Sequence, residues 1–458
     1  MQGLFPISAR RADAQGALWT RTAGAPRQIA MNSTRSDADT PGLPARKAAL
    51  KLLDAVLRRG QPLEMALHGA TQGIGRSDDR ALVHAIAAET LRHLPDLDAL
   101  IDSATARPLP DDAKARTALR IALVQALALG TPPHAAIATV LPLVDGGPRK
   151  LVHGVYGTLM RKGVTLLSPP TLPAYAQARW TEYWGEDVAE AARTAIAAPP
   201  PLDLTLADPA ETEKWTAELG GTSLMPGHVR VIDAAPVTSL PGFDAGRWWV
   251  QDLAASLPAR LLGAGEGRRV LDLCAAPGGK ALQLAAHGWR VTALDKSAAR
   301  LRRVEENADR TGLALDIVEG DALSWQPAAP VPAILLDAPC SATGIFRRHP
   351  DVLHRVGARD INEMAALQGS LLARAIDWLA PGGTLIYATC SMEPEEGERQ
   401  IEALLAARDD MALDPIRTDE LPAGLAPHER GWLRTAPGML MEAGGLDGFF
   451  IARIVRKA

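Results

Sequence analysis

Two cysteines occupy positions from which a thiol could act as a nucleophile. Cys340 lies in the string DAPCSATG, residues 337–344, and Cys390 lies in ATCS, residues 388–391. Each stands at or just past the end of an apolar run typical of a buried strand. If the two strands are neighbours they run about 4.8 Å apart, and both thiols face one crevice at the ligand-binding edge of the sheet. Free cysteines are usually buried and inert, but this paired placement beside polar residues favours covalent catalysis.

A glycine-containing loop follows another predicted strand, at residues 270–273. The loop reads CAAPGGK and consists of Cys274, Ala275, Ala276, Pro277, Gly278, Gly279 and Lys280. The order of strand, glycine turn and helix directs backbone N–H groups and a helix N-terminus towards a nucleoside cofactor. The loop lacks the G-x-G-x-x-G spacing, which counts against NAD. Cys274 is interpreted as a residue that lines the cofactor rather than as a nucleophile.

Acidic residues stand at the ends of the next two predicted strands. Asp295 ends the strand at 290–294, where an acid commonly grips the diol of a ribose. Asp321 follows the strand at 316–318, where an acid can meet the exocyclic amine of an adenine. Each acid alone is more often a helix cap or a turn residue. Together with the glycine loop, at three successive strand ends, they favour S-adenosylmethionine as the cofactor.

The elements that must position these residues alternate between strands and helices from residue 268 onward. Predicted strands cover residues 270–273, 290–294, 316–318, 333–337 and 384–389, and predicted helices cover residues 280–287, 298–311 and 360–379. This alternation is typical of a parallel sheet with helices on both faces. We therefore expect residues 259–458 to form a Rossmann-like α/β domain.

The residues before this domain are helical over a long stretch. Residues 44–165 show helical periodicity throughout and predict an all-α domain. Within it, Ser77 is expected to cap the second helix. The segment 119–129 is apolar nearly all round, which predicts a buried central helix.

Two further parts complete the predicted organisation. Residues 166–258 contain two proline runs, a predicted helix at 176–198 and two short predicted strands, and indicate a linker with a small α+β module. Residues 1–43 lack periodicity and are expected to be a disordered basic leader, with Met31 as an alternative start. The whole chain is thus predicted to be multidomain.

Composition and charge exclude several classes of protein. The 458 residues hold 49 Lys and Arg against 53 Asp and Glu, so the chain is not uniformly basic. Three cysteines without C-x-x-C spacing argue against a disulfide framework and against a metal site, and favour a reduced cytoplasmic setting. No apolar run approaches the ~20 residues that a membrane span needs.

Two groups of cations are candidates for phosphate contacts. Residues 111–163 hold seven Lys or Arg against three Asp, which indicates either a solvated surface or a phosphate-contacting face. A second group follows the Cys340 loop and comprises Arg347, Arg348, His349 and Arg355. For that group, too, a solvated helix face is the alternative.

These strings carry a family resemblance. CAAPGGK, DAPCSATG and ATCS resemble the S-adenosylmethionine-dependent RNA (cytosine-5) methyltransferases. The helical domain, with Ala45-Arg46 at its start, is similar to the NusB fold, and the strings VQDLAAS at 250–256 and DGFFIA at 447–452 also match. The combination resembles the bacterial Sun, or RsmB, family, which methylates small-subunit ribosomal RNA. The resemblance runs from about Ala45 to the C-terminus.

The sequence departs from the family pattern at two places. His153 stands where the family has an Asn in the last NusB helix. Residues 204–206 read Leu-Thr-Leu where the RNA-binding module usually carries Arg-x-Asn. These differences concern the RNA contacts of the NusB-like domain and the middle module, and they leave the catalytic strings intact.

The resemblance implies a reaction and a role for each residue. A cytosine C5 in 16S ribosomal RNA, free or in an early small-subunit particle, would be methylated in the cytoplasm by a monomer. Cys390 would attack C6 of the base, and Cys340 would help to release the enzyme afterwards. Asp337 would bond the base edge near N3 as well as border the cofactor, and Lys280 would approach the base or the thiolate.

Three other functions fit the same sequence. A different RNA, such as tRNA, could be the substrate of the same chemistry. A DNA cytosine-5 methyltransferase would use the Pro-Cys thiol of Cys340 as its nucleophile and would not require Cys390. A NusB-like RNA-binding adaptor would have lost catalysis, although here every catalytic position is filled.

Overall fold

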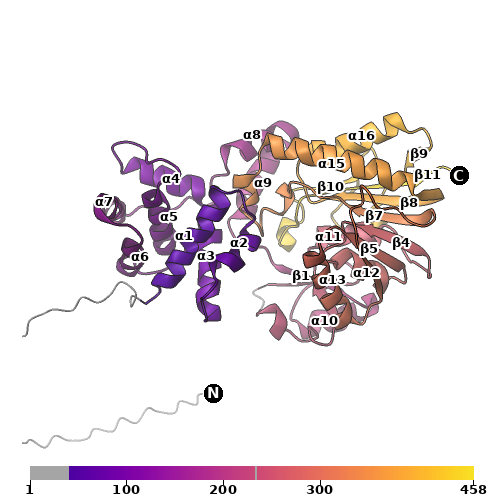
Figure 1. Cartoon of the computed structure of the whole chain (residues 1–458), viewed down its shortest axis with the longest axis horizontal. Coiled ribbons are helices and arrows are strands. Elements are labelled where there is room, and N and C mark those ends of the chain that lie inside the picture. Colours follow the sequence, from indigo (N-terminus) through magenta and orange to yellow (C-terminus); the bar gives the residue numbers. More distant parts are fainter. Residues whose placement is uncertain (1–40, 233–234) are drawn as a thin grey trace, which may run out of the picture. The chain divides into compact units, whose positions relative to one another are not determined.

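The computed structural model describes residues 41–232 and 235–458 (Figure 1). Of the leader expected at residues 1–43, only residues 41–43 are described, and the alternative start at Met31 lies outside the described residues. None of the described helices is long and apolar enough to cross a membrane.

The first described segment is all-helical, as predicted. Its helices are α1 (Leu43–Leu57), α2 (Leu63–Ala70), α3 (Ser77–Arg92), α4 (Leu94–Ser103), α5 (Lys114–Leu127), α6 (Pro133–Val140) and α7 (Gly146–Arg161). Helix α5 is buried over most of its length, which confirms the predicted central helix. The short helix α2 precedes the helix predicted to be second. Ser77 is the first residue of α3 and makes no capping hydrogen bond, so that predicted role was wrong.

The basic stretch at 111–163 presents fewer free cations than its composition suggested. Arg116 is buried and pairs with Asp98 at 3.0 Å and Asp102 at 2.7 Å, while Arg120 is buried and pairs with Asp98 at 2.7 Å. These arginines hold helices α4 and α5 together. Five exposed cations remain: Lys114 at the start of α5, and Arg149, Lys150, Arg161 and Lys162 on and just after α7.

The middle segment contains a helix pair and a small sheet. Helices α8 (Ala174–Trp184) and α9 (Glu186–Ile196) replace the single helix predicted at 176–198. They are separated by Gly185 at φ 88°, a backbone conformation that favours glycine and ends the first helix. Strands β1 (Leu202–Leu206), β2 (His228–Val231) and β3 (Trp248–Val250) form an antiparallel sheet in the order β2-β1-β3, with α10 (Thr212–Glu218) between β1 and β2.

The C-terminal segment is built on one larger sheet. Its strands are β4 (Arg269–Leu273), β5 (Arg290–Asp295), β6 (Leu315–Glu319), β7 (Val331–Asp337), β8 (Leu379–Thr389), β9 (Met411–Leu413), β10 (Leu433–Thr435) and β11 (Phe449–Arg456). The main path is β10-β11-β8-β7-β4-β5-β6, and β9 pairs with β11. The five predicted strands are parallel, but β9, β10 and β11 are antiparallel additions. The sheet is therefore mixed: its parallel part is the one predicted, and the three antiparallel strands were not predicted.

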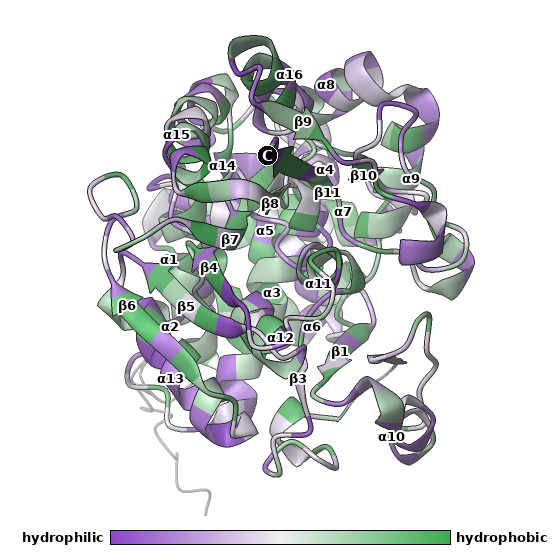
Figure 2. Cartoon of the chain, turned by 90° about the vertical axis from the view of Figure 1, so that its right-hand side faces the viewer, coloured by the Kyte–Doolittle hydropathy of each residue, from purple (hydrophilic) through white to green (hydrophobic). Residues whose placement is uncertain are grey.

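Helices cover both faces of this sheet. They are α11 (Leu253–Arg260), α12 (Gly279–Ala286), α13 (Ala298–Thr311), α14 (Val352–Arg355), α15 (Ala358–Asp377) and α16 (Glu398–Ala407). Because successive strand residues face opposite sides, Leu335 packs in the core with α11 and α12, whereas Leu336 packs with α15 and α16. Figure 2 shows hydrophobic residues along the sheet and hydrophilic residues along α13.

Hydrogen bonds join the N-terminal helices to the segment that follows Cys340. Arg92 donates to the carbonyls of Ile196 and Arg347 at 2.9 and 2.8 Å. The backbone N–H of Leu63 donates to Asp351 at 3.2 Å. The connection is therefore made by buried polar contacts.

The arginines expected to contact phosphate are engaged inside the protein instead. Arg347 is buried and donates to the carbonyl of Gly444 at 2.6 Å. Arg348 pairs with Asp252 at 3.2 Å, and Arg355 pairs with the buried Asp351 at 2.9 Å. These contacts correct the proposed phosphate role of the three arginines, since their charges neutralise buried acids of neighbouring segments.

We predict that acid loosens this connection through His354. Its Nε2 donates to the carbonyl of Leu91 at 2.7 Å, and burial lowers the pKa of His354 to about 4. The unfolded chain takes up the proton near pH 6.5, so the stabilisation is complete above that pH and is lost as the pH falls towards 4. Between pH 7 and pH 5, urea unfolding should show wild type losing up to about 2 kcal/mol more than His354→Gln, which keeps an N–H donor. Equal pH dependence in the two proteins would contradict this prediction.

Candidate active site

The two thiols meet at the carboxyl edge of the sheet. Strands β7 and β8 are parallel neighbours, with Asp337 opposite Ala388. The Sγ atoms of Cys340 and Cys390 lie 3.4 Å apart, so the two thiols are neighbours, but only Cys390 lines a cavity formed by the described residues. The N–H of Gly344 donates to the carbonyl of Cys390 at 3.0 Å, which ties the two loops together.

The glycine loop turns sharply between β4 and α12. Cys274 has φ 61° and Gly278 has φ 105°, the left-handed conformations that reverse the chain at the end of β4. A Cβ at Gly278 would lie 3.1 Å from the side chain of Val304 on α13, so the turn also needs a residue without a side chain for close packing. Helix α12 then begins at Gly279, as the motif predicted.

The loop separates two cavities. The smaller, of about 70 Å³, brings together three residues singled out from the sequence, namely Cys274, Asp295 and Asp321. The larger, of about 450 Å³, is lined by Cys390, Asp337 and several loop residues, namely Ala275, Pro277, Gly279 and Lys280. Asp337, expected near both base and cofactor, therefore lies on the cavity that contains the Cys390 thiol.

A partly buried ion pair lines the larger cavity. Lys280 Nζ lies 2.7 Å from Asp337 Oδ2, and the Lys280 side chain is only 11% exposed. Burial lowers the pKa of Lys280, but Asp337 and the nearby Cys390 more than offset this effect, so the pKa is raised above its usual value. Lys280 is thus a fixed cation close to the thiol, as its expected role requires.

The thiols have different electrostatic surroundings. Burial and the neighbouring Asp295 raise the pKa of Cys274 to about 12, which keeps that thiol neutral and agrees with a lining role. The pKa of Cys340 is raised well above its usual value by its contact with Cys390, by burial and by nearby Glu396. These surroundings favour the neutral thiol form of Cys340.

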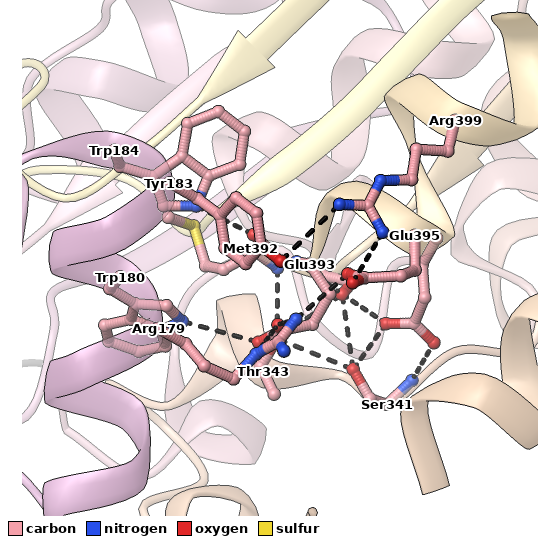
Figure 3. Close-up of polar contacts among 12 residues, drawn as sticks. Arg179, Trp180, Tyr183, Trp184, Ser341, Thr343, Met392, Glu393, Glu395 and Arg399 are labelled. Atoms are coloured by element: carbon pink, nitrogen blue, oxygen red, sulfur yellow. Dashed lines mark hydrogen bonds and ion pairs between the residues drawn. The ribbon is translucent and has the colours of Figure 1, made fainter. Parts of the chain in front are cut away.

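Helix α8 fixes the segment after Cys390 from outside. Arg179 pairs with Glu393 at 2.6 Å and with Glu395 at 2.9 Å, and Trp184 Nε1 donates to the carbonyl of Met392 at 2.8 Å. Figure 3 shows Arg179 and Trp184 directed from α8 towards this loop. The middle segment therefore helps to hold the candidate active site, a role that the sequence did not suggest.

One acid at the site escaped the sequence analysis. Asp272, on β4, is fully buried, and neither carboxylate oxygen has a hydrogen-bond partner among the described residues. Burial and the nearby Asp337 raise its pKa well above the usual range. Its position two residues before Cys274 was the only available signal, and it does not distinguish Asp272 from an ordinary strand residue.

Comparison with known proteins places this architecture in a class. The crystal structure of PH0851 shares the fold, with a TM-score of 0.70 and 22% identity over 90% of this chain and 98% of that one. The model of the family 16S rRNA methyltransferase RsmB/F matches residues 259–455, and the NusB family model matches residues 43–149. The protein is accordingly an S-adenosylmethionine-dependent methyltransferase with an N-terminal NusB domain.

Two curated relatives extend the match to nearly the whole chain. The ribosomal RNA small subunit methyltransferase B of Xanthomonas campestris pv. campestris is 36% identical over 438 residues, 91% of this chain and 98% of the relative. The protein of the same name from Klebsiella pneumoniae subsp. pneumoniae is 34% identical over 447 residues, 90% of this chain and 98% of the relative. The chain belongs to the RsmB/F methyltransferase family, which confirms the resemblance drawn from its motifs.

The smaller cavity fits the nucleoside end of S-adenosylmethionine. The buried Asp295 carboxylate accepts the N–H groups of Ala276 at 3.2 Å and Ser297 at 2.9 Å, and its remaining lone pairs can accept from a ribose diol. Apolar walls suited to an adenine come from Pro339, Leu367 and Leu371. Asp321 also lines this cavity, and its carboxylate accepts the N–H of Leu323 at 2.9 Å, so it has the turn role that the sequence offered as the alternative.

We predict that Asp295→Ala weakens cofactor binding by roughly tenfold to a hundredfold. The change removes a charged acceptor, and a hydrogen bond to a charged group is worth about 1.5–3 kcal/mol. Calorimetric titration with S-adenosylmethionine would measure the dissociation constant. Asp316→Ala, at an exposed carboxylate on neighbouring β6, is the matched control and should bind normally. Unchanged affinity in Asp295→Ala would remove Asp295 from the cofactor site.

Proposed function

We propose that this protein methylates C5 of a cytosine in 16S ribosomal RNA through a covalent bond between Cys390 and C6 of the base. The observation that carries the proposal is the pair of thiols 3.4 Å apart at the ends of β7 and β8. Cys390 lines the larger cavity together with Lys280 and Asp337. The relatives named ribosomal RNA small subunit methyltransferase B support the choice of RNA.

The chemistry requires a nucleophile because C5 of cytosine is too weak to take a methyl group directly. The Cys390 thiolate forms a bond to C6, which turns the ring into an enamine whose C5 is nucleophilic. Bound S-adenosylmethionine supplies the methyl group to C5. A base then removes the C5 proton, the electrons of that C–H bond restore the ring double bond, and Cys390 leaves as a thiolate. Cys340, beside the departing sulfur, assists this release.

The Lys280–Asp337 pair supports the addition step. The Asp337 carboxylate accepts from Lys280 at 2.7 Å, so it is suited to accept from the exocyclic amine of cytosine as well. The Lys280 ammonium is also close enough to Cys390 for the two groups to interact electrostatically.

The target base must leave any stack to reach the thiol, as methyltransferases acting on bases require. The larger cavity has aromatic walls from Phe243, Trp249 and Phe449, which suit an extruded base. Phosphates are expected to meet the exposed cations of α7 in the NusB domain. The partner is ribosomal RNA, free or in an early small-subunit particle, and the enzyme acts as a monomer in the cytoplasm.

The proposal is tested by mapping 5-methylcytosine in the source organism. Bisulfite sequencing of 16S ribosomal RNA from a deletion strain should lose one methylated cytosine. A plasmid carrying the wild-type gene should restore it, and a plasmid carrying Cys390→Ala should not. A loss confined to tRNA or to DNA would assign the enzyme to that substrate, and no loss anywhere would favour the inactive RNA-binding adaptor.

A further inference from the structure

We propose that Glu396 is a positioning residue that holds the Cys340 and Cys390 loops at the separation the two-thiol reaction needs, an inference that rests on the function proposed above. Glu396 lies in the turn before α16 and is fully buried. Its carboxylate does not line either cavity at the glycine loop. Its influence on the reaction would therefore pass through the residues that it binds.

The carboxylate bonds the residue next to each cysteine. Glu396 Oε1 accepts the backbone N–H of Ser341 at 2.8 Å, and Oε2 accepts the hydroxyl groups of Ser341 and Ser391. Ser341 directly follows Cys340, and Ser391 directly follows Cys390. One side chain thus spans the gap between the loops that end β7 and β8.

A third element joins the same carboxylate. Gln368, buried on α15, donates to Glu396 Oε1 at 3.1 Å and to the carbonyl of Pro339 at 2.7 Å. The cysteine loops are therefore anchored to the long helix α15 as well as to each other. The Tyr387 hydroxyl on β8 donates to the backbone carbonyl of Glu396 at 2.7 Å, which fixes the turn itself.

The hydroxyl groups of Ser341, Thr343 and Ser391 complete a set of hydrogen bonds between the two cysteine loops, here called the seam. Ser341 Oγ and Ser391 Oγ lie 3.2 Å apart, and Thr343 Oγ1 lies 3.3 Å from Ser391 Oγ. The N–H of Met392 donates to Thr343 Oγ1 at 3.0 Å. Figure 3 shows Ser341, Thr343, Arg179 and Trp180 gathered around the loop that carries Met392 and Glu393. The segment after Cys390 is thus held both by the Cys340 loop and by α8.

The pattern of donors suits a carboxylate and no neutral substitute. Both oxygens of Glu396 receive only donors: two N–H groups at Oε1 and two hydroxyl groups at Oε2. A glutamine of the same shape must present its NH₂ group to one of these pairs. If the NH₂ group takes the place of Oε1, it faces two N–H donors. If it takes the place of Oε2, both hydroxyl groups must rotate so that their oxygens accept from it. Either arrangement weakens the seam without opening a large cavity.

The test compares Glu396→Gln with wild type in two assays. Diamide oxidises two neighbouring thiols to a disulfide and is itself reduced to the hydrazine, so its reaction rate reports the Cys340–Cys390 geometry without RNA or cofactor. Peptide mapping separates this disulfide from reactions of Cys274. Glu396→Gln should form it at least about tenfold more slowly. In methyl transfer its kcat should fall by roughly tenfold to a hundredfold, since misplacement by about 1 Å has that cost.

The controls separate positioning from general stability. A merely structural role would change the KM for RNA and the cofactor Kd together with kcat, whereas positioning leaves both within about twofold. Glu402→Gln, which alters an exposed glutamate on α16 paired with Arg430, should resemble wild type throughout. If Glu396→Gln does not fold, Ser391→Ala removes one hydroxyl of the seam and should show a smaller loss in both assays.

The positioning role would be overturned if Glu396→Gln formed the disulfide at the wild-type rate and had the wild-type kcat. If only Ser391→Ala folds, the same result in that variant would overturn it. The thiol assay also distinguishes this failure from failure of the proposed function. If no RNA is methylated by wild type but Glu396→Gln still slows the disulfide, Glu396 positions the thiols and the proposed reaction is wrong. If methylation is confirmed and neither readout changes, the reaction stands and Glu396 is not its positioning residue.

Discussion

Cys390→Ala is expected to lose methyl transfer entirely and to form no covalent RNA complex, whereas Cys340→Ala should accumulate one. Without the Cys390 thiol nothing adds to C6, so C5 is never activated. Without Cys340 the addition and the methyl transfer proceed, but release of the enzyme stalls. Denaturing electrophoresis of each variant with target RNA and S-adenosylmethionine should show a shifted, RNA-linked protein only for Cys340→Ala. The two roles can be divided because the sulfurs are only 3.4 Å apart, while Cys390 and not Cys340 lines the larger cavity.

The alternative mechanisms predict different RNA-linked bands on the denaturing gel. A DNA-type mechanism, in which Cys340 attacks, predicts the reverse: an adduct from Cys390→Ala and none from Cys340→Ala. Two inert cysteines predict full activity in both variants and a stability change on the order of 1 kcal/mol. Cys274→Ala removes the third cysteine of the chain and should still form the adduct, although its cofactor affinity is expected to fall because Cys274 lines the smaller cavity. A stable adduct from Cys390→Ala would overturn the assignment of the nucleophile.

The proximity of the two cysteines could be predicted because the end of a strand can be read from the local sequence and fixes where a residue lies in the sheet. An apolar run identifies a strand, and the carboxyl ends of parallel strands share one edge of a sheet. Cys340 and Cys390 therefore needed only the assumption that β7 and β8 are neighbours, which their register confirms. The glycine loop, Asp295 and Asp321 followed from the same reasoning, and Cys274, Asp295 and Asp321 line one cavity.

The partners of charged residues could not be predicted, because they come from distant parts of the chain. Arg347 and Arg348 looked like a surface group, yet Asp252 and Asp447 neutralise them from segments about a hundred residues away in either direction. The hydrophobic periodicity of the sequence gives no signal for an ion pair between distant segments.

The antiparallel strand β11 was missed for a related reason. It interrupts the regular alternation of strand and helix, and its place beside β8 is set by packing of the completed sheet. The seam around Glu396 depends on the same tertiary arrangement, since a serine after each cysteine has no obvious meaning until both loops lie side by side.

The second large effect is expected from the partly buried ion pair of Lys280 and Asp337. Lys280→Met should lower kcat by roughly a hundredfold or more, the usual contribution of a positioned proton donor or acceptor. The change keeps the length of the side chain, so packing near Phe449, whose ring centre lies 5.5 Å from Nζ, is largely preserved. Single-turnover methyl transfer would measure the chemical step. Lys214→Met, at an exposed lysine paired with Glu211, should have no effect on it.

The companion variant Asp337→Asn tests how the charge of Lys280 is maintained. In wild type, burial lowers the pKa of Lys280 while Asp337 and neighbouring Cys390 raise it above the ordinary value, so the ammonium persists across the assay range. Without the carboxylate the effect of burial is largely unopposed, and the pKa should fall. Activity should then decline as the pH rises through this lowered pKa, at a pH where wild type shows no such loss from Lys280. If both proteins lose activity at the same alkaline pH, the ammonium of Lys280 does not take part in the reaction. The residual activity of Lys280→Met would then show whether Lys280 contributes only to packing.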